Sequence, residues 1–132
     1  MSLTSFFERL GAPLANSRWS WGAQRPHDGA VFLRVWQDEK FVAEGVLHML
    51  IDRDPVGDAR LGHQERRRHS ELIRAGARCF LVMCTAVDVD ASRRKIASFN
   101  EDEVFIGVQI VEKDGSIWIQ VKGRSPVSEV IR

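Results

Sequence analysis

The longest apolar run of the chain, from Cys79 to Val87, constrains the fold most strongly. A run in which almost every residue is apolar is typical of a central strand that is covered on both faces. Its nine residues are too few for a membrane-spanning helix, which needs about 20. Cys79 and Cys84 would face opposite sides of such a strand, so we expect two reduced core thiols rather than a disulfide. With no signal peptide in the sequence, reduced cysteines predict a cytoplasmic protein that does not associate with a membrane.

Turn residues and apolar periodicity divide the rest of the chain mostly into strands. Gly62 to Ala75 is the strongest helix prediction, because it contains no proline and Gly76 follows its end. Its apolar side is thin, so we expect this helix to lie on the surface of a sheet. The other predicted elements are a helix over Ser2–Leu10, strands over Ala15–Gly22, Val31–Trp36, Phe41–Ile51 (with a bulge at Gly45), Val104–Glu112 and Ser116–Lys122, polar loops over Asp52–Asp58 and Asp88–Asn100, and a capping segment over Pro126–Ile131.

The predicted elements define the fold class. The 132 residues are enough for one domain, residues 1–132, with one core. Asp114 and Gly115 predict a two-residue turn of the primed type between the last two strands. Strands joined by hairpins rather than by helical crossovers favour an antiparallel sheet. We therefore predict an α+β fold: a curved, mainly antiparallel sheet or half-open barrel with one main helix and a short N-terminal helix.

Three of the four tryptophans fall within eighteen residues and suggest a binding site. On an extended strand, Trp19 and Trp21 would point to the same side. On the second strand, Arg34 would share one face with Phe32 and Trp36, and a charged residue between two aromatic ones suggests the wall of a groove. Stacking on an indole contributes about 1–3 kcal/mol per nucleic-acid base. The predicted ligand-binding residues are therefore Arg18, Trp19, Ser20, Trp21, Arg34 and Trp36. The alternative is that the tryptophans pack in the core while the head of Arg34 reaches water.

Local clusters of arginine predict a surface for phosphates, although the formal net charge is only +1. Arg60, Arg67 and Arg74 repeat every seven residues, which places them along one side of a helix. The predicted phosphate contacts are Arg60, Arg67, Arg74, Arg78, Arg93, Arg94 and Lys95, and His63, Arg66, Arg68 and His69 would add positive charge nearby. The alternative is a solvated helix face whose acidic residues offset part of this charge.

The sequence contains no motif that indicates catalysis, a cofactor or a metal. It has neither a serine-nucleophile elbow nor a glycine-rich phosphate loop. Asp52 with Asp54, and Asp88 with Asp90, could each share a face at a strand end and hold Mg²⁺. However, the Glu-x-Lys strand that a common nuclease site requires does not accompany them. These observations favour a binding protein over an enzyme and predict no cofactor and no metal.

Three segments resemble a group of uncharacterised bacterial proteins of this size: Asn16-x-Arg18-Trp19-Ser20-Trp21-Gly22-Ala23, Val31–Trp36 and Arg94-Lys95-Ile96-x-Ser98-Phe99. The order of elements is also similar to that of PUA-like barrels, a superfamily that includes readers of modified bases in DNA and RNA. This resemblance implies recognition of nucleic acid, but it carries no individual reader residue over to this chain.

These patterns together predict a nucleic-acid binding module that recognises a modified or exposed base. One alternative is a small-molecule-binding protein or enzyme that uses the same aromatic cleft. A second alternative is a protein–protein module that forms a homodimer through an exposed sheet edge. The first two functions differ in whether the basic residues lie on the same side of the molecule as the tryptophans.

Overall fold

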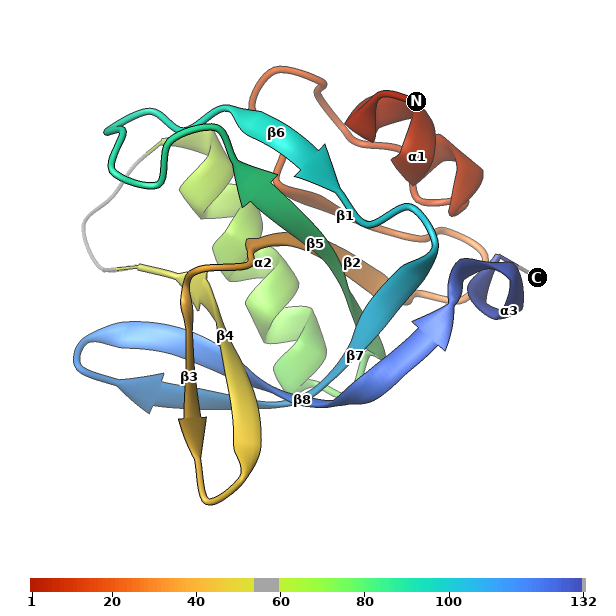
Figure 1. Cartoon of the computed structure of the whole chain (residues 1–132). Coiled ribbons are helices and arrows are strands. Elements are labelled where there is room, and N and C mark those ends of the chain that lie inside the picture. Colours follow the sequence, from red (N-terminus) through yellow and green to blue (C-terminus); the bar gives the residue numbers. More distant parts are fainter. Residues whose placement is uncertain (54–59, 132) are drawn as a thin grey trace.

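The computed structural model describes residues 1–53 and 60–131 of the chain. Its elements, shown in Figure 1, are α1 (Leu3–Arg9), β1 (Gly22–Gln24), β2 (Val31–Trp36), β3 (Lys40–Ala43), β4 (Val46–Asp52), α2 (Leu61–Arg74), β5 (Cys79–Ala86), β6 (Ile96–Phe99), β7 (Glu103–Lys113), β8 (Ser116–Pro126) and α3 (Val127–Val130). The loop predicted over Asp52–Asp58 is thus described only as far as Arg53, and Asp54 lies outside the described residues. None of the helices in the described ranges is long and apolar enough to cross a membrane.

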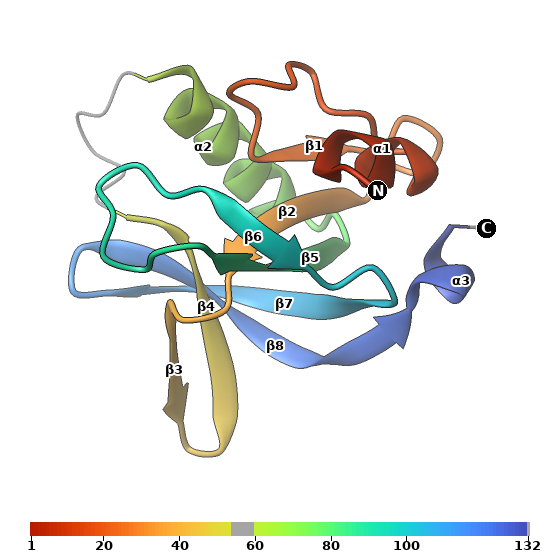
Figure 2. The ribbon, with the colours of Figure 1, turned by 45° about the horizontal axis from the view of Figure 1, so that its top comes forward.

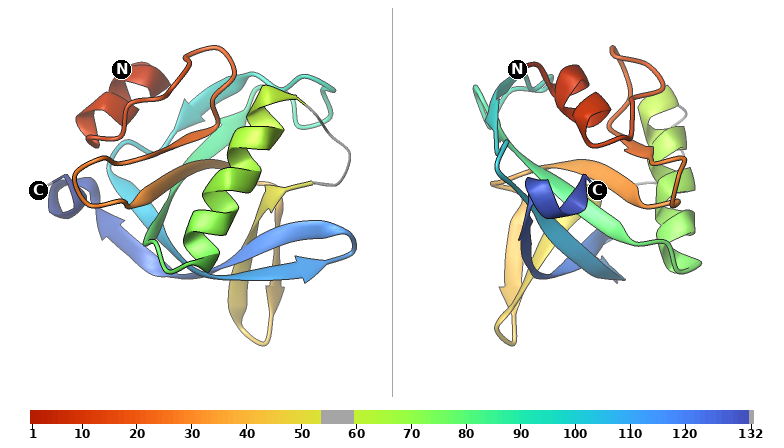
Figure 3. Two further views of the ribbon diagram at one scale, coloured as in Figure 1. Left: turned by 180° about the vertical axis from the view of Figure 1, so that it is seen from behind. Right: turned by 90° about the vertical axis from the view of Figure 1, so that its right-hand side faces the viewer.

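The eight strands of the described residues form one open sheet in the order β1-β2-β5-β7-β8-β4-β3, with β6 paired to β5. This confirms an α+β fold with a mainly antiparallel sheet. The strands β2 and β5 form a parallel pair, in which Val31 lies beside Cys79 and Trp36 beside Cys84. A parallel pair needs a long crossover connection. Here the crossover contains the β3–β4 hairpin and helix α2, and Figure 3 shows α2 lying across the sheet.

The sheet buries apolar side chains on both of its faces, because alternate residues of a strand point in opposite directions. Phe32 of β2 packs in one core with Phe6 of α1. Leu33 of β2 packs in the other core with Ile73 of α2. Strand β5 contributes to both cores, which confirms the prediction of a central strand covered on both faces. Its two cysteines are buried, free thiols that belong to opposite cores, as predicted.

The long strand predicted over Phe41–Ile51 is wrong, because this segment is the hairpin β3–β4. Glu44 and Gly45 have φ values of 52° and 78°, the left-handed geometry that a two-residue primed turn requires at both positions. Asp114 and Gly115 adopt the same geometry, with φ values of 54° and 78°, between β7 and β8. The turn predicted at Asp114–Gly115 is therefore confirmed, and Glu44–Gly45 is a second turn of the same kind.

Two further differences concern strands β1 and β6. The strand predicted over Ala15–Gly22 is wrong, since residues 17–19 form a turn and β1 begins only at Gly22. Strand β6 lies inside the stretch Asp88–Asn100, for which the sequence predicts a loop, and it pairs with the end of β5. Helices α1 and α2 agree with their predicted ranges to within one residue at each end, and β2 has the predicted bounds.

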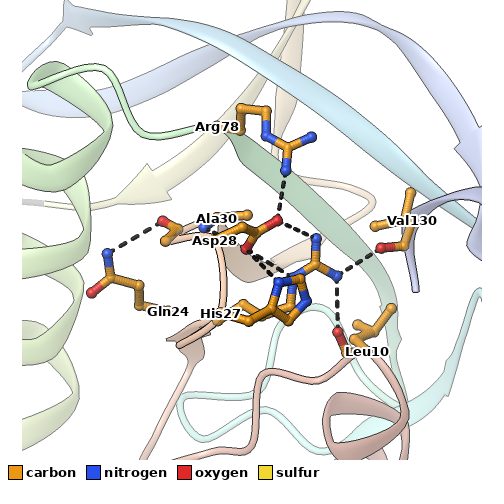
Figure 4. Close-up of polar contacts among 9 residues, drawn as sticks. Leu10, Gln24, His27, Asp28, Ala30, Arg78 and Val130 are labelled. Carbon is orange, nitrogen blue, oxygen red and sulfur yellow. Dashed lines mark hydrogen bonds and ion pairs between the residues drawn. The ribbon is translucent and has the colours of Figure 1, made fainter. Parts of the chain in front are cut away.

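One buried guanidinium anchors both terminal helices to the sheet (Figure 4). Arg25 donates hydrogen bonds to the backbone carbonyls of Leu10, at the end of α1, and Val130, in α3, at 3.0 and 2.7 Å. It also donates two hydrogen bonds of 3.0 and 2.7 Å to the carboxylate of Asp28. Arg78 donates to the same carboxylate at 2.6 Å. These charge-assisted bonds, those from Arg25 above all, hold the pKa of the Asp28 carboxyl well below its usual range.

We expect Asp28→Asn to lower the free energy of unfolding by about 2 kcal/mol at neutral pH, because it leaves the buried Arg25 without its counter-charge. The folded protein binds a proton at Asp28 less readily than the unfolded chain does. The stabilisation is therefore complete above the unfolded pKa of about 3.9 and is lost progressively as the pH falls from there towards the lower pKa of the folded protein. Urea unfolding of both proteins from neutral pH to about pH 3 measures this difference. A difference that stays constant over this range would contradict the assignment.

Candidate functional site

The segment that carries the first two tryptophans contains a turn that Asn16 holds. The Asn16 Oδ1 accepts a hydrogen bond from the backbone N–H of Arg18 at 2.8 Å, and its carbonyl accepts one from Ser20 at 3.0 Å. An Asn side chain that bonds two residues ahead is typical of such turns. Residues 17–19 are therefore no strand. The prediction that Trp19 and Trp21 share one face of a strand is wrong for this reason.

Helix α2 fixes the residues that follow this turn. The Glu65 carboxylate accepts hydrogen bonds from the Ser20 hydroxyl at 2.8 Å and from the backbone N–H of Trp21 at 3.0 Å. Gly62 allows the close approach, because a Cβ added there would lie only 2.6 Å from the Trp21 indole. Ser20 is among the predicted ligand-binding residues, but it is buried and donates its hydroxyl hydrogen to Glu65.

Arg66, the next residue of α2, joins the helix to three other segments. Its guanidinium donates hydrogen bonds to the backbone carbonyls of Ile51 in β4 (2.8 Å), Trp21 (2.9 Å) and Arg34 in β2 (2.9 Å). Arg66 is only 4% exposed, and burial lowers the pKa of its guanidinium to about 10. The group therefore stays charged at neutral pH, and its charge strengthens each of these hydrogen bonds.

The side of α2 that faces the protein is largely polar, since His63, Glu65, Arg66, His69 and Ser70 are all buried. The prediction that His63, Arg66 and His69 add positive charge to an exposed surface is therefore wrong. Burial, together with the neighbouring positive charge of Arg66, lowers the pKa of His69 to about 4. His69 is thus neutral at physiological pH. The sequence pattern did not predict this buried polar side of α2, because charged residues are seldom fully buried.

Two tryptophans and two arginines form a contact series that we call the Trp–Arg row: Trp21, Arg34, Trp36 and Arg94. The guanidinium carbon of Arg34 lies 6.0 Å from the centre of the Trp21 ring and 5.7 Å from that of Trp36. The guanidinium carbon of Arg94 lies 5.4 Å from the Trp36 ring. Asp38 holds Arg94 in this position through hydrogen bonds of 2.7 and 2.9 Å. All three ring distances are in the range of cation–π contacts.

The Trp–Arg row lies where several segments of the chain meet. Trp36 is the last residue of β2, and Figure 1 shows the end of β5 and the start of α2 on the same side of the molecule. Ligands of open sheets commonly bind at the carboxyl ends of parallel strands. Trp21, Arg34 and Trp36 are all half-buried, so the row is partly open to solvent. Burial lowers the pKa of Arg34, an effect that the nearby Cys84 and Glu65 partly offset.

Further basic residues adjoin both ends of the Trp–Arg row along the chain. Arg18 lies three residues before Trp21, and Arg93 and Lys95 adjoin Arg94 in the loop between β5 and β6. Arg18, Arg93 and Lys95 are exposed and form no ion pair with another described residue. Of the predicted phosphate contacts, Arg94 therefore contacts Trp36, and Arg93 and Lys95 adjoin Arg94 along the chain.

The remaining predicted phosphate contacts are spread along α2. Arg60 lies at its N-cap and contacts His63, which itself contacts Trp21, so Arg60 is close to the row. Arg67 is half-buried in the middle of the helix. Arg74 and Arg78 lie at the other end of the helix, roughly 20 Å from Arg60 along the helix axis. Both form ion pairs with acidic residues there, so the structure does not bring them to the tryptophans.

A histidine–aspartate pair packs against the ring of Trp21. The rings of His63 and Trp21 meet edge to face at 4.7 Å, and Nδ1 of His63 lies 3.0 Å from Oδ1 of Asp52. Arg60 donates to Nε2 of His63 at 2.8 Å, because a guanidinium can only donate. The ring proton of His63 is therefore on Nδ1 and is donated to Asp52. Burial raises the pKa of the Asp52 carboxyl, which the bond to His63 partly offsets. Such a pair can orient a general base, but here Arg60 covers the second ring nitrogen.

Other features of the described residues give no separate indication of function. Cavities of about 420 and 530 Å³ lie beside β6, and none of the four tryptophans lines them. No three His, Cys, Asp or Glu side chains within residues 1–53 and 60–131 gather as metal ligands would. Comparison with protein-family models, curated proteins and solved structures finds no match to the chain. The function must therefore be inferred from the geometry of the Trp–Arg row.

We expect Arg66→Lys to lower the free energy of unfolding by about 3 kcal/mol. A compact ammonium cannot reach carbonyls from three segments at once, so at least one buried carbonyl loses its donor. Arg68→Lys, on the exposed side of the same helix, is the matched control and should change stability by less than about 0.5 kcal/mol. Urea unfolding followed by tryptophan fluorescence measures both effects. Equal stability of the Arg66→Lys variant and the original protein would contradict the role of Arg66.

Proposed function

We propose that the protein binds nucleic acid through the Trp–Arg row, with exposed bases stacking on Trp21 and Trp36. The observation that carries this proposal is the alternation of indole rings and guanidinium groups along the row, at 5.4 to 6.0 Å. Each indole is half-buried, so it is held rigidly and still offers part of its surface. Aromatic platforms of this kind bind unpaired bases without regard to sequence, because every base has a flat π face.

The unpaired cations supply the second part of the proposal. Arg18, Arg93 and Lys95 flank the row, and a strand whose bases stack on the tryptophans would place phosphates near its two ends. Because the net charge of the protein is only +1, such a local cluster rather than an overall field must attract the ligand. An exposed base in a single strand, loop or opened duplex is therefore the proposed ligand.

We expect Trp36→Ala to weaken the binding of a single-stranded oligonucleotide by about tenfold or more, since one stacking contact is worth about 1–3 kcal/mol. Trp118→Ala is the matched control, because Trp118 is also half-buried but lies on β8, away from the row. Fluorescence anisotropy with labelled DNA and RNA strands at low salt measures the affinity. Failure to bind any strand at low salt would contradict the proposed function.

A second variant keeps this test independent of folding, because Trp36 also packs against the core. The double variant Arg93→Ala/Lys95→Ala removes two exposed side chains and should leave stability unchanged. The logarithm of affinity should then fall less steeply with the logarithm of salt, by about 0.7 for each phosphate that the variant no longer neutralises. Lys122→Ala, on β8, should leave the slope unchanged. Binding of free nucleosides with no salt dependence would instead support a small-molecule site.

A further inference from the structure

Strand β3 forms a free edge of the sheet. It is the last strand in the pairing order and contacts β4 on one side only. Figures 1 and 2 show that the β3–β4 hairpin projects away from the rest of the molecule. At the centre of the strand, Val42 is 66% exposed, second only to Val87 among the large apolar side chains of the described residues. An unpaired strand with an apolar centre is a template for pairing with another strand.

The hairpin turn determines which backbone groups of β3 are free. Across a two-residue turn, the flanking residues Ala43 and Val46 form a hydrogen-bonded pair, and such pairs alternate along the hairpin. The bond from the Leu50 N–H to the Glu39 carbonyl, 3.0 Å long, belongs to the same series. The N–H and C=O groups of Val42, which fall between these pairs, therefore point away from β4.

We propose that two copies of this chain associate through β3, antiparallel to each other about a two-fold axis at Val42. In this register Val42 lies opposite the partner's Val42, and the two residues exchange their free N–H and C=O groups in two hydrogen bonds. The register brings Lys40 next to Glu44 in the partner's turn, and Glu44 next to the partner's Lys40. The exposed valine thus becomes an apolar centre with an ion pair on either side, and both sheets continue into one another.

The charges along β3 favour this register over its neighbours. Lys40 and Glu44 are exposed, and neither forms an ion pair with another residue in the described ranges. An axis at Phe41 would need backbone groups that already bond to β4. An axis at Lys40 would place two lysines directly opposite each other, which destabilises a strand pair. Because the strand has only four residues, the interface is small, and we expect a dimer that dissociates on dilution.

Charge reversal tests the register directly. Lys40→Glu and Glu44→Lys should each abolish the dimer, because each places like charges opposite one another, and the double variant Lys40→Glu/Glu44→Lys should restore it. Sedimentation velocity over a concentration series at low salt measures the dimer fraction. Arg9→Glu and Glu101→Lys make the same changes in net charge far from β3 and should leave that fraction unchanged. A monomer at every concentration, or a double variant that stays monomeric, would overturn the proposal.

A covalent trap provides a second test that does not depend on affinity. Opposed residues of a hydrogen-bonded antiparallel pair have Cα atoms about 5.5 Å apart, within the range that a disulfide spans. Val42→Cys should therefore form a covalent dimer under mild oxidation, while the buried Cys79 and Cys84 stay reduced. Val46→Cys, on the inner strand of the same hairpin, is the matched control and should remain monomeric. Equal cross-linking of both variants, or no cross-linking of the Val42→Cys variant, would contradict the register.

Discussion

The guanidinium of Arg66 makes the contacts on which the rest of the structure depends. It lies under α2 and donates hydrogen bonds to the carbonyls of Ile51, Trp21 and Arg34, which belong to the end of β4, the loop before β1, and β2. Removing a guanidinium from water is costly, and only well-placed acceptors compensate for that cost. The acceptors are backbone carbonyls, and that of Trp21 also accepts a hydrogen bond from the backbone N–H of Arg34 at 2.9 Å. This single side chain therefore joins the helix, two strands and a loop to one another.

The hydrogen bonds of Arg66 also set the geometry of the Trp–Arg row. Two of the three carbonyls belong to Trp21 and Arg34, which are members of the row. Glu65, the neighbour of Arg66, holds the backbone N–H of Trp21. Elsewhere in the described residues, carboxylates hold arginines in place, as Asp28 holds Arg25 and Asp38 holds Arg94.

The sequence predicted those parts of the fold that rest on local signals. Asp114–Gly115 marks its turn because both residues readily adopt left-handed φ, whereas Glu44–Gly45 was missed because glutamate seldom does. The length of α2 could be predicted, but its buried face could not, because charged residues such as Glu65 and Arg66 are typical of a solvated helix surface. Their burial depends on carbonyls and hydroxyls brought from elsewhere in the chain. The Trp–Arg row was predicted only in part, because the contact between Arg94 and Trp36 joins residues far apart in the sequence and no sequence periodicity indicates it.

The most direct test of the central claim is the response of the four tryptophan indole N–H signals in a nitrogen–proton NMR spectrum. Each tryptophan gives one such signal, and single substitutions assign them. Adding a short single-stranded oligonucleotide at low salt should shift the signals of Trp21 and Trp36 most and leave that of Trp118 in place. A spectrum in which Trp118 shifts while Trp21 and Trp36 do not would contradict the account and would place the nucleic-acid site elsewhere on the protein.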